Sequence, residues 1–186
     1  GLLLAYPAGR GEILIGKFLA HLAALGIATC IGLGSAGVVA ALAGGAGSES
    51  VLALFRLIVT ATLLGAVFVL LGYALSSLAK SPAAAAGLAA GLWLVFVVLF
   101  DLGLLGAVVL DDGGVFTQKI FPWVMVANPA DAFRVWNVAA SDGVALASGM
   151  AGAAQMLPVW AAPLSLLSWP LLGFGLACAA FRRVEP

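Results

Sequence analysis

The sequence predicts an all-α membrane protein, in which a bundle of helices crosses a lipid bilayer several times. The first observation is composition: hydrophobic residues make up 64% of the 186-residue chain and charged residues only 9%. About a quarter of the residues of an ordinary soluble domain are charged. The second observation is a mean hydropathy of +1.20. A soluble globule of this size would have too little polar surface to cover so much apolar side chain.

The third observation is that the apolar residues fall into four stretches, each long enough to span a bilayer. A membrane-spanning helix needs about 20 mainly apolar residues, and such stretches cover residues 18–43, 51–79, 83–110 and 159–181. No charge cluster interrupts them, so each can make its backbone hydrogen bonds internally as a helix. The strands of a membrane barrel would instead alternate polar and apolar residues, and the sequence shows no such alternation.

Basic residues mark one side of the predicted bundle. Lys17 precedes the first stretch, Lys80 separates the second from the third, and an Arg-Arg pair follows the fourth, whereas the connection GGAGSES on the opposite side carries only Glu49. Cytoplasmic loops carry an excess of Lys and Arg. We therefore expect a multi-pass protein of the inner (cytoplasmic) membrane, with both ends of this chain cytoplasmic and residues 111–158 an external helical segment. With a net charge of zero and no basic tract, nucleic acid is not expected as a partner.

Two short motifs resemble nucleotide-binding sites but lie in the wrong context. Gly11–Lys17 reads G-x-x-x-x-G-K, yet Phe18 stands where a P-loop needs Ser or Thr, and a helix is expected where a P-loop needs a strand. Gly32–Gly37 reads G-x-G-x-x-G inside a predicted span, again without a preceding strand. We interpret these glycines, and the G-x-x-x-G of Gly87 and Gly91, as small residues that let helices approach closely.

No constellation typical of a catalytic or metal site is recognisable. Cys30 and Cys178 belong to no Cys-x-x-Cys motif, so we predict neither zinc nor another cofactor. The three methionines of segment 111–158 do not cluster, which favours packing over a copper-handling surface. The single histidine, His21, is interpreted as an interfacial polar residue, with a place in a substrate or proton path as the alternative.

Two ionisable residues lie inside the predicted spans. Asp101 is ten residues before Asp111, or about 15 Å along the helix, and Arg56 lies shallower on the neighbouring span. A charge at the centre of a bilayer costs about 2.5–3.5 kcal/mol on insertion scales, so such groups usually face the bundle interior and pair. We predict an Asp101–Arg56 contact, or a polar cluster with Thr60 and Thr62. This cluster would either lock two helices together or line a transport route.

The stretch FPWVMVANPADAFRVWNVAAS predicts a short amphipathic helix near the outer membrane surface. Asn128 is a good N-cap, Pro129 suits the first helical position, and Asp131 favours the positive helix start. Such a helix serves either as a well-capped surface element or as a direct substrate contact. Its aromatic face and the polar residues beside it comprise Phe133, Trp136, Arg134 and Asn137.

The opening segment, residues 1–17, is partly apolar and would face the cytoplasm. A leucine run ends at Tyr-Pro, a polar turn follows, and Gly-Lys leads into the membrane. A membrane protein with such a connector and without catalytic residues often takes its energy from a partner. The candidate coupling residues are Tyr6, Pro7, Arg10, Gly11 and Glu12.

The run LLLAYPAGRGEILIGKFL resembles the coupling-helix region of ABC-2 type transporter permeases, where a leucine-rich stretch leads to Pro, Arg, an Ile-Leu pair and Gly-Lys. The resemblance covers essentially the whole chain. It implies six spans in a full family member, of which the first two would precede the Gly1 of this fragment. The Asn-Pro-Ala-Asp-x-Phe-Arg run resembles, more narrowly, the permeases whose transporters serve maturation of nitrous-oxide reductase in denitrifiers.

This resemblance implies a membrane-spanning permease subunit that is not itself an enzyme. ATP hydrolysis would belong to a separate ABC ATPase subunit, and the permease would work as a homodimer in the lipid bilayer, with a possible periplasmic partner protein. Its task would be export, or maturation of the copper centres of nitrous-oxide reductase. The alternatives are an ABC-2 permease for another cargo, such as a lipid, polysaccharide or drug, and a non-transporting scaffold that the ATPase drives mechanically.

Overall fold

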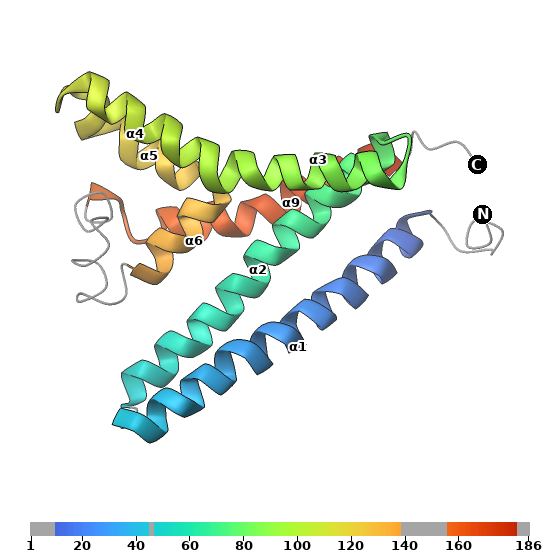
Figure 1. The fold of residues 1–186 in the computed structure, drawn as a ribbon, viewed down its shortest axis with the longest axis horizontal. Coiled ribbons are helices and arrows are strands. Elements are labelled where there is room, and N and C mark those ends of the chain that lie inside the picture. Colours follow the sequence, from blue (N-terminus) through green and yellow to red (C-terminus); the bar gives the residue numbers. More distant parts are fainter. Residues whose placement is uncertain (1–9, 45–46, 139–155, 182–186) are drawn as a thin grey trace.

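The computed structural model describes residues 10–44, 47–138 and 156–181, and these parts of the chain form long helices and short ones nested among them (Figure 1). Four helical segments are long and apolar enough to cross a membrane, which confirms the predicted all-α bundle with four spans. They are α1 (Arg10–Gly44), α2 (Ser48–Leu78), the segment from Pro82 to Asp111, and α9 (Ala161–Phe181).

Successive spans run in alternating directions, so the bundle has two ends. One end carries the connection between α2 and the third span and is called here the Lys80 end; the other, where the third span finishes, is called the Asp111 end (Figure 1). Helix α1 begins at the Lys80 end and α9 finishes there. The first span begins earlier than predicted, because α1 already starts at Arg10. Gly11 and Glu12 therefore belong to a helix and not to a polar turn before it.

Helices α1 and α2 form an antiparallel hairpin that packs through glycines. A Cβ added at Gly37 would lie 2.2 Å from Leu54 Cδ2, and one at Gly65 would lie 2.2 Å from Leu25 Cδ2. Each leucine therefore occupies the space that a side chain would need on the opposite helix, as expected where helices approach closely in lipid. Between these two contacts, Thr29 and Thr62 share a hydrogen bond of 2.9 Å across the helices.

The prediction for the other glycines is only partly correct. Gly37 makes the close approach expected of the G-x-G-x-x-G stretch, but a Cβ at Gly32 or Gly34 would meet no atom within 4 Å in the part of the chain that the structure describes. The same holds for Gly87 and Gly91. Their G-x-x-x-G face lies on an exposed side of the third span and does not bring two described helices together.

The third span consists of two α-helices joined by a π-helical turn. Helix α3 (Pro82–Leu94) begins with a capped turn, because the Ser81 hydroxyl accepts a hydrogen bond of 3.2 Å from Ala84 N and Pro82 occupies the first turn. The π-helical turn η2 (Val95–Leu99) follows, and α4 (Phe100–Asp111) completes the span. The chain then reverses through Asp112 and Gly113, which have φ angles of 45° and 79°.

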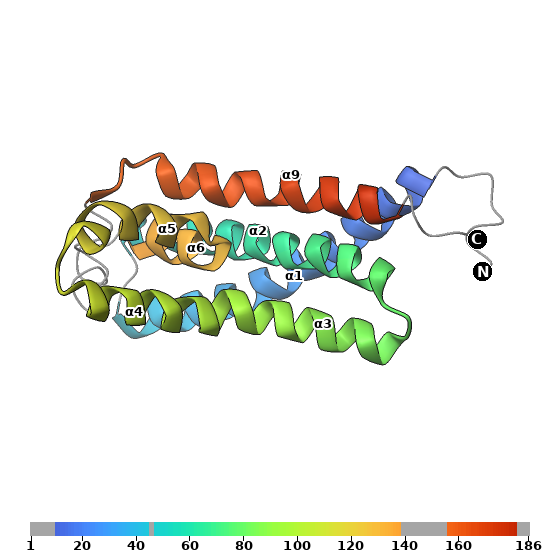
Figure 2. The ribbon, with the colours of Figure 1, turned by 90° about the horizontal axis from the view of Figure 1, so that it is seen from above.

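After this reversal the chain returns toward the middle of the bundle. A second π-helical turn, η3 (Phe116–Ile120), leads to α5 (Phe121–Ala127) and then to α6 (Pro129–Val138). Figure 2 shows α5 and α6 nested between the third span and α9. The sequence predicts α6 near the outer membrane surface. The structure instead places the start of α6 beside Phe96, fifteen residues and about 22 Å before the end of the third span.

Helix α9 completes the bundle by packing along α2. A Cβ added at Gly173 would lie 3.0 Å from Leu70 Cβ, so the two helices are in close contact here. The core cluster lies toward the Asp111 end, where α5 and α6 meet α4 and α9. It comprises Leu104, Met125, Val126, Ala132, Val135, Leu157, Ala161, Ala162 and Leu166, against which Phe133 and Trp136 pack. Helix α6 is therefore enclosed by apolar side chains on several sides.

Candidate functional site

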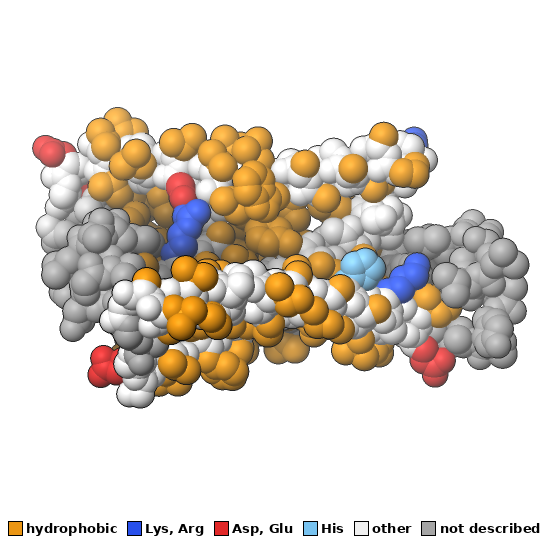
Figure 3. Space-filling model, turned by 60° about the horizontal axis from the view of Figure 1, so that its bottom comes forward, with side chains coloured by type: hydrophobic (Ala, Val, Ile, Leu, Met, Phe, Trp, Pro, Cys, Tyr) orange, Lys and Arg blue, Asp and Glu red, His pale blue; other side chains and the backbone are white. Residues whose placement is uncertain are grey.

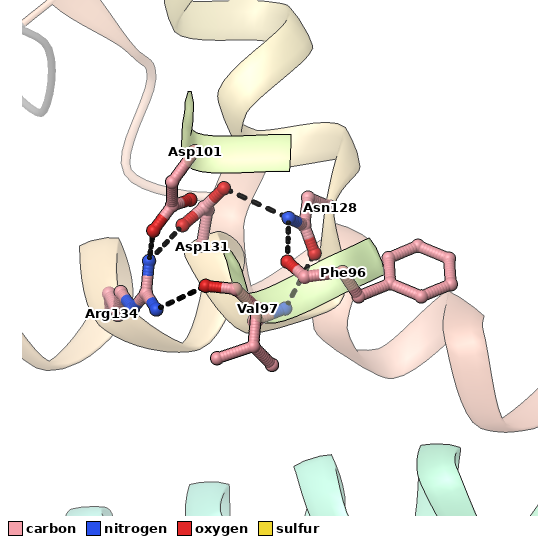
Figure 4. Close-up of polar contacts among 7 residues, drawn as sticks. Phe96, Val97, Asp101, Asn128, Asp131 and Arg134 are labelled. Carbon is pink, nitrogen blue, oxygen red and sulfur yellow. Dashed lines mark hydrogen bonds and ion pairs between the residues drawn. The ribbon is translucent and has the colours of Figure 1, made fainter. Parts of the chain in front are cut away.

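The polar residues of the third span and of α6 meet in one cluster at the π-helical turn. A π-helix pairs each carbonyl with an N–H one residue further along than an α-helix does, which disturbs the regular ladder and frees an acceptor where the two join. The carbonyl oxygens of Phe96 and Val97 both lie within this turn. The Phe96 carbonyl accepts a hydrogen bond from Asn128, just before α6, and the Val97 carbonyl accepts one from Arg134 within α6 (Figure 4).

Asn128 links the start of α6 to the third span. Its Oδ1 accepts a hydrogen bond of 3.0 Å from Ala130 N, so it caps the helix as the sequence predicts. Its Nδ2 donates to the Phe96 carbonyl at 2.7 Å and to Asp131 Oδ2 at 3.0 Å. Only 2% of Asn128 is exposed. A side chain predicted as a helix cap therefore also fastens that cap to the neighbouring span.

Arg134 holds the two carboxylates of the cluster. Its Nη1 donates to Asp101 Oδ2 at 2.5 Å and to Asp131 Oδ1 at 2.7 Å, and its Nη2 lies 3.5 Å from the Val97 carbonyl oxygen (Figure 4). Asp131 is buried, with 2% of its surface exposed, whereas the side chains of Arg134 and Asp101 retain 34% and 39%. We call Asn128, Asp131, Arg134 and Asp101, with the two carbonyls, the α6 clamp.

Burial makes the charge of Asp131 costly. Removal from water, reinforced by the nearby negative charge of Asp101, raises the pKa of Asp131 to about 7, although Arg134 opposes the shift. The ordinary value for this side chain is about 4. Both carboxylates therefore depend on the same arginine. The clamp is a network of hydrogen bonds and ion pairs that joins α6 to the third span.

Aromatic side chains also contact the turn between α5 and α6 and the π-helical turn. The Trp169 indole on α9 donates from Nε1 to the Ala127 carbonyl at 2.9 Å, and its ring meets that of Phe96 edge-on with centroids 5.4 Å apart. Phe68 of α2 meets the same Phe96 ring at 6.4 Å. The turn between α5 and α6 is thus bonded to α9 and to the third span, and the Phe96 ring joins the third span to α2.

The predicted contact between Asp101 and Arg56 is wrong, because Asp101 pairs with Arg134. Arg134 belongs to the segment that the sequence predicts to be external, where a partner for an intramembrane carboxylate is not expected. Thr60 does join a polar cluster, but through α6: Asn137 Nδ2 donates to Thr60 Oγ1 at 2.9 Å. Thr62 lies on the other side of α2 and bonds to Thr29 of α1.

Of the candidate coupling residues, the described ones, Gly11 and Glu12, lie apart from this clamp, at the Lys80 end. Tyr6 and Pro7 fall outside the described residues, as does the side chain of Arg10, while Gly11 and Glu12 are exposed on the first turns of α1. The Gly11–Lys17 stretch is helical, so it does not form the loop that nucleotide phosphates require.

The other polar residues singled out in the sequence have local roles. His21 Nδ1 lies 2.8 Å from both the Lys17 carbonyl oxygen and the Tyr73 hydroxyl, so it bridges α1 and α2. Cys30 and Cys178 are free thiols. Of the methionines, Met125 is buried, Met156 is exposed, and the third lies outside the described residues.

The described segments contain no group of three His, Cys, Asp or Glu side chains that could hold a metal ion. The arrangement at the π-helical turn is suited to fixing helices relative to each other. Sequence reasoning missed the carbonyls of Phe96 and Val97 and the roles of Asn137 and Trp169. The run VFVVLFD contains no breaker residue that would signal a π-helical turn.

Comparison with known proteins agrees with this architecture. A family model described as "ABC-2 family transporter protein" matches residues 1–185. The chain is 44% identical to "Probable ABC transporter permease protein NosY" of Pseudomonas aeruginosa over 186 residues, which cover 98% of this chain and 67% of that protein. It is 41% identical to the protein of the same description from Stutzerimonas stutzeri, with the same coverage. The chain belongs to the ABC-2 family of transporter proteins and is a permease component with several membrane-spanning helices.

Proposed function

We propose that this chain is the membrane-spanning part of a permease that couples ATP hydrolysis by a separate ABC ATPase to the maturation of the copper centres of nitrous-oxide reductase. The observation that carries this proposal is the identity of 44% and 41% to two NosY permeases, spread over 98% of the chain. The Asn-Pro-Ala-Asp-x-Phe-Arg run, which resembles the same permeases, supplies three of the four clamp side chains here. The permease acts as a homodimer, with a periplasmic protein as a further partner.

The charge distribution supports an orientation with the Lys80 end in the cytoplasm. Lys17 and Lys80 lie near this end, while Glu49 lies in the first turn of α2, at the other end. Lys119 also lies at the Asp111 end, but long external segments are translocated largely regardless of charge. The protein is then an inner-membrane protein with α5 and α6 entered from the periplasmic side.

In this orientation the first turns of α1 face the ATPase. Residues Tyr6 to Glu12 form its contact surface, and α1 continues from Arg10 to Gly44 as one helix of 35 residues. Because α1 is one continuous helix, a displacement at Glu12 also moves its opposite end. The leucine–glycine contacts between α1 and α2 transmit this displacement to α2, and α2 transmits it to the third span and α9 as a rigid-body movement.

The clamp supports force transmission as a second candidate mechanism. Asp101, the acidic residue in the middle of the third span, is occupied by an ion pair that locks α6 to that span. A carboxylate that is held in this ion pair is not available to bind a cargo. A scaffold that the ATPase drives mechanically, without net transport, therefore stands beside export as a candidate activity.

The test uses a denitrifying strain that lacks its own permease and carries the full-length protein containing this chain. We expect the wild-type protein to restore copper-loaded reductase, measured by its optical spectrum and copper content, and the double variant R10A/E12A to lower both. The ATPase should also copurify less well with this variant. Lys119→Gln, at the opposite end, is the control. If the double variant supports normal copper loading and ATPase binding, the coupling role is wrong.

A second measurement separates export from force transmission. The intact complex is reconstituted into vesicles, and ATP hydrolysis is followed together with movement of copper and sulfur species across the membrane. An exporter accumulates cargo on one side in proportion to hydrolysis. A scaffold hydrolyses ATP without such accumulation, and reductase maturation then still depends on the permease.

A further inference from the structure

The exposed part of the α6 clamp lies deep in the third span. Asp101 comes ten residues before the end of that span at Asp111, or about 15 Å along the helix. Its side chain keeps 39% of its surface exposed, and the side chain of Arg134, which pairs with it, keeps 34%. Ionisable side chains at such depth usually face the interior of a bundle or a polar cavity. We therefore expect a polar group from outside the described residues to cover this pair.

The surface of the molecule is hollowed on this face. Figure 3 shows a basic and an acidic side chain side by side in a hollow that apolar side chains border. Helix α1 and the third span lie at opposite edges of the bundle (Figure 1). They are also the least covered spans: no residue in the most apolar window of α1 and 6% of those in the third span are buried, against 28% for α2 and for α9. The described bundle is therefore least complete around α1 and the third span.

The clamp has more hydrogen-bond acceptors than its arginine can supply with donors. Asp101 and Asp131 both bond to Arg134, so two carboxylates share one guanidinium. Arg134 reaches Asp101 through the carboxylate oxygen Oδ2, whereas a carboxylate offers about four acceptor positions on two oxygens. The group that covers the exposed pair should therefore carry a hydrogen-bond donor.

A second copy of this chain is poorly suited to supply that donor. In a two-fold contact it would bring its own two carboxylates and one arginine, so the excess of acceptors would double. The acyl chains of lipids carry no donor. A helix that presents a hydroxyl, amide or basic side chain is suited, because such side chains form hydrogen bonds between helices in membranes.

The curated relatives are long enough to provide such a helix. This chain covers 67% of each NosY permease, so the remaining third is about half as long as this chain and exceeds the roughly 40 residues that two spans require. The resemblance to ABC-2 permeases implies that two spans precede α1 in a full family member. Consecutive helices are usually neighbours in space, so a span before α1 is expected beside α1.

We propose that a span preceding α1 in the full-length permease docks in this hollow, between α1 and the third span, and donates a hydrogen bond to Asp101. The clamp then joins three segments of the chain instead of two. A further consequence rests on the proposed coupling role of Tyr6 to Glu12, which connect the docked span to α1. A displacement of these residues reaches the clamp through the docked span as well as through α2.

The experiment identifies what lies beside Asp101 in the intact complex. The photoreactive residue p-benzoylphenylalanine replaces Leu105 of the full-length permease, because Leu105 lies one helical turn after Asp101 on the same side of α4 and is 61% exposed. In the control the same residue replaces Leu171 of α9, which is 76% exposed. After irradiation in native membranes, mass spectrometry identifies the cross-linked peptide.

We expect the probe at Leu105 to cross-link a span that precedes α1 in the same chain, and we expect this product to be lost when the probe is at Leu171. A cross-link within one chain leaves the mass on a denaturing gel unchanged, whereas a cross-link between two copies doubles it. Cross-linking of Leu105 to a second copy, or to lipid alone, overturns the proposal. Copper loading is not the readout, so this result does not depend on the proposed function.

A double-mutant cycle then tests the hydrogen bond. The donor of the cross-linked span is replaced by Ala, alone and together with Asp101→Leu, and the midpoints of thermal unfolding are compared. We expect the double variant to lose less than the sum of the two single losses, because both substitutions remove the same bond. Additive losses overturn the bond to Asp101. If Asp101→Leu does not fold, the same cycle with Asp101→Asn, which loses the charge but keeps an acceptor oxygen, should show the donor substitution still destabilising; no effect of that substitution overturns the bond.

Discussion

The α1–α2 hairpin and the α6 clamp hold helices together in different ways. In the hairpin, leucines of one helix fill the space above glycines of the other, at Leu54 over Gly37 and Leu25 over Gly65. A hydroxyl pair joins the two helices near the middle, and His21 bonds to Tyr73 nearer the Lys80 end. In the clamp, an amide, a guanidinium and two carboxylates connect α6 to a π-helical turn of the third span.

This difference shows which contacts can adapt. Packing of leucine on glycine is non-directional, so the hairpin can slide or tilt slightly without losing much energy. The clamp consists of directional hydrogen bonds between buried groups, and a small displacement leaves several of them unpaired at once. We therefore expect the clamp to behave as an all-or-none lock and the hairpin to transmit graded movement.

The largest expected effect comes from removing the cation of the clamp. Arg134→Leu leaves Asp101 and Asp131 facing each other without a counter-charge, and loss of one partner from such a network costs about 3 kcal/mol, at the low end of the usual range because Arg134 is partly exposed. We expect a strongly reduced yield of folded permease and a lower thermal midpoint in detergent. The matched variant Arg134→Lys should recover part of the loss. Equal stability of Arg134→Leu and wild type would contradict the lock.

An intermediate effect is expected in the hairpin. Gly65→Ala places a Cβ 2.2 Å from Leu25 Cδ2, so the leucine must move, at a cost of about 1–2 kcal/mol. Gly72→Ala, on the same helix, meets no atom within 4 Å among the described residues and serves as the control. The thermal midpoint should fall for the first and stay equal or rise slightly for the second. Identical shifts would mean that the hairpin does not pack through this glycine.

The smallest expected effect is a pH dependence of folding stability that comes from the clamp and not from the hairpin. The pKa of Asp131 is raised to about 7 in the folded protein, against about 4 when unfolded, so the folded state binds more protons between these values. Stability should fall as the pH rises through about 7, by about 1 kcal/mol between pH 6 and pH 8. Asp131→Asn should remove this slope, whereas Gly65→Ala should leave it unchanged. A slope that persists in Asp131→Asn assigns the titration to another group.

The sequence predicts the bundle well because length and hydropathy determine a membrane span almost alone. The stretches from Pro82 to Asp111 and from Ser48 to Leu78 could be recognised by composition, and Asn128 with Pro129 by its capping pattern. These features depend on residues that are close in the chain.

The clamp could not be predicted in the same way, because it depends on where a chain segment returns in space. Asp112, Gly113 and Gly114 indicate a turn after the third span, but no residue there indicates that α5 and α6 then run back along that span. The depth of Asp101 in its span correctly predicts a charged partner, but that partner is Arg134 and not Arg56. The π-helical turn also gives no local signal, since its freed carbonyls are stabilised by the partner side chains and not by its own residues.

The π-helical turn has a consequence for how the family can vary in length. A single π turn between two α-helices is equivalent to one extra residue inserted into a regular helix. A relative that lacks one residue between Val95 and Leu99 would keep both halves of the span facing their present neighbours. It would lose only the carbonyls offered to Asn128 and Arg134. In relatives with this deletion we therefore expect both Asn128 and Arg134 to be replaced. The deletion and the two replacements should occur together in a lineage or not at all.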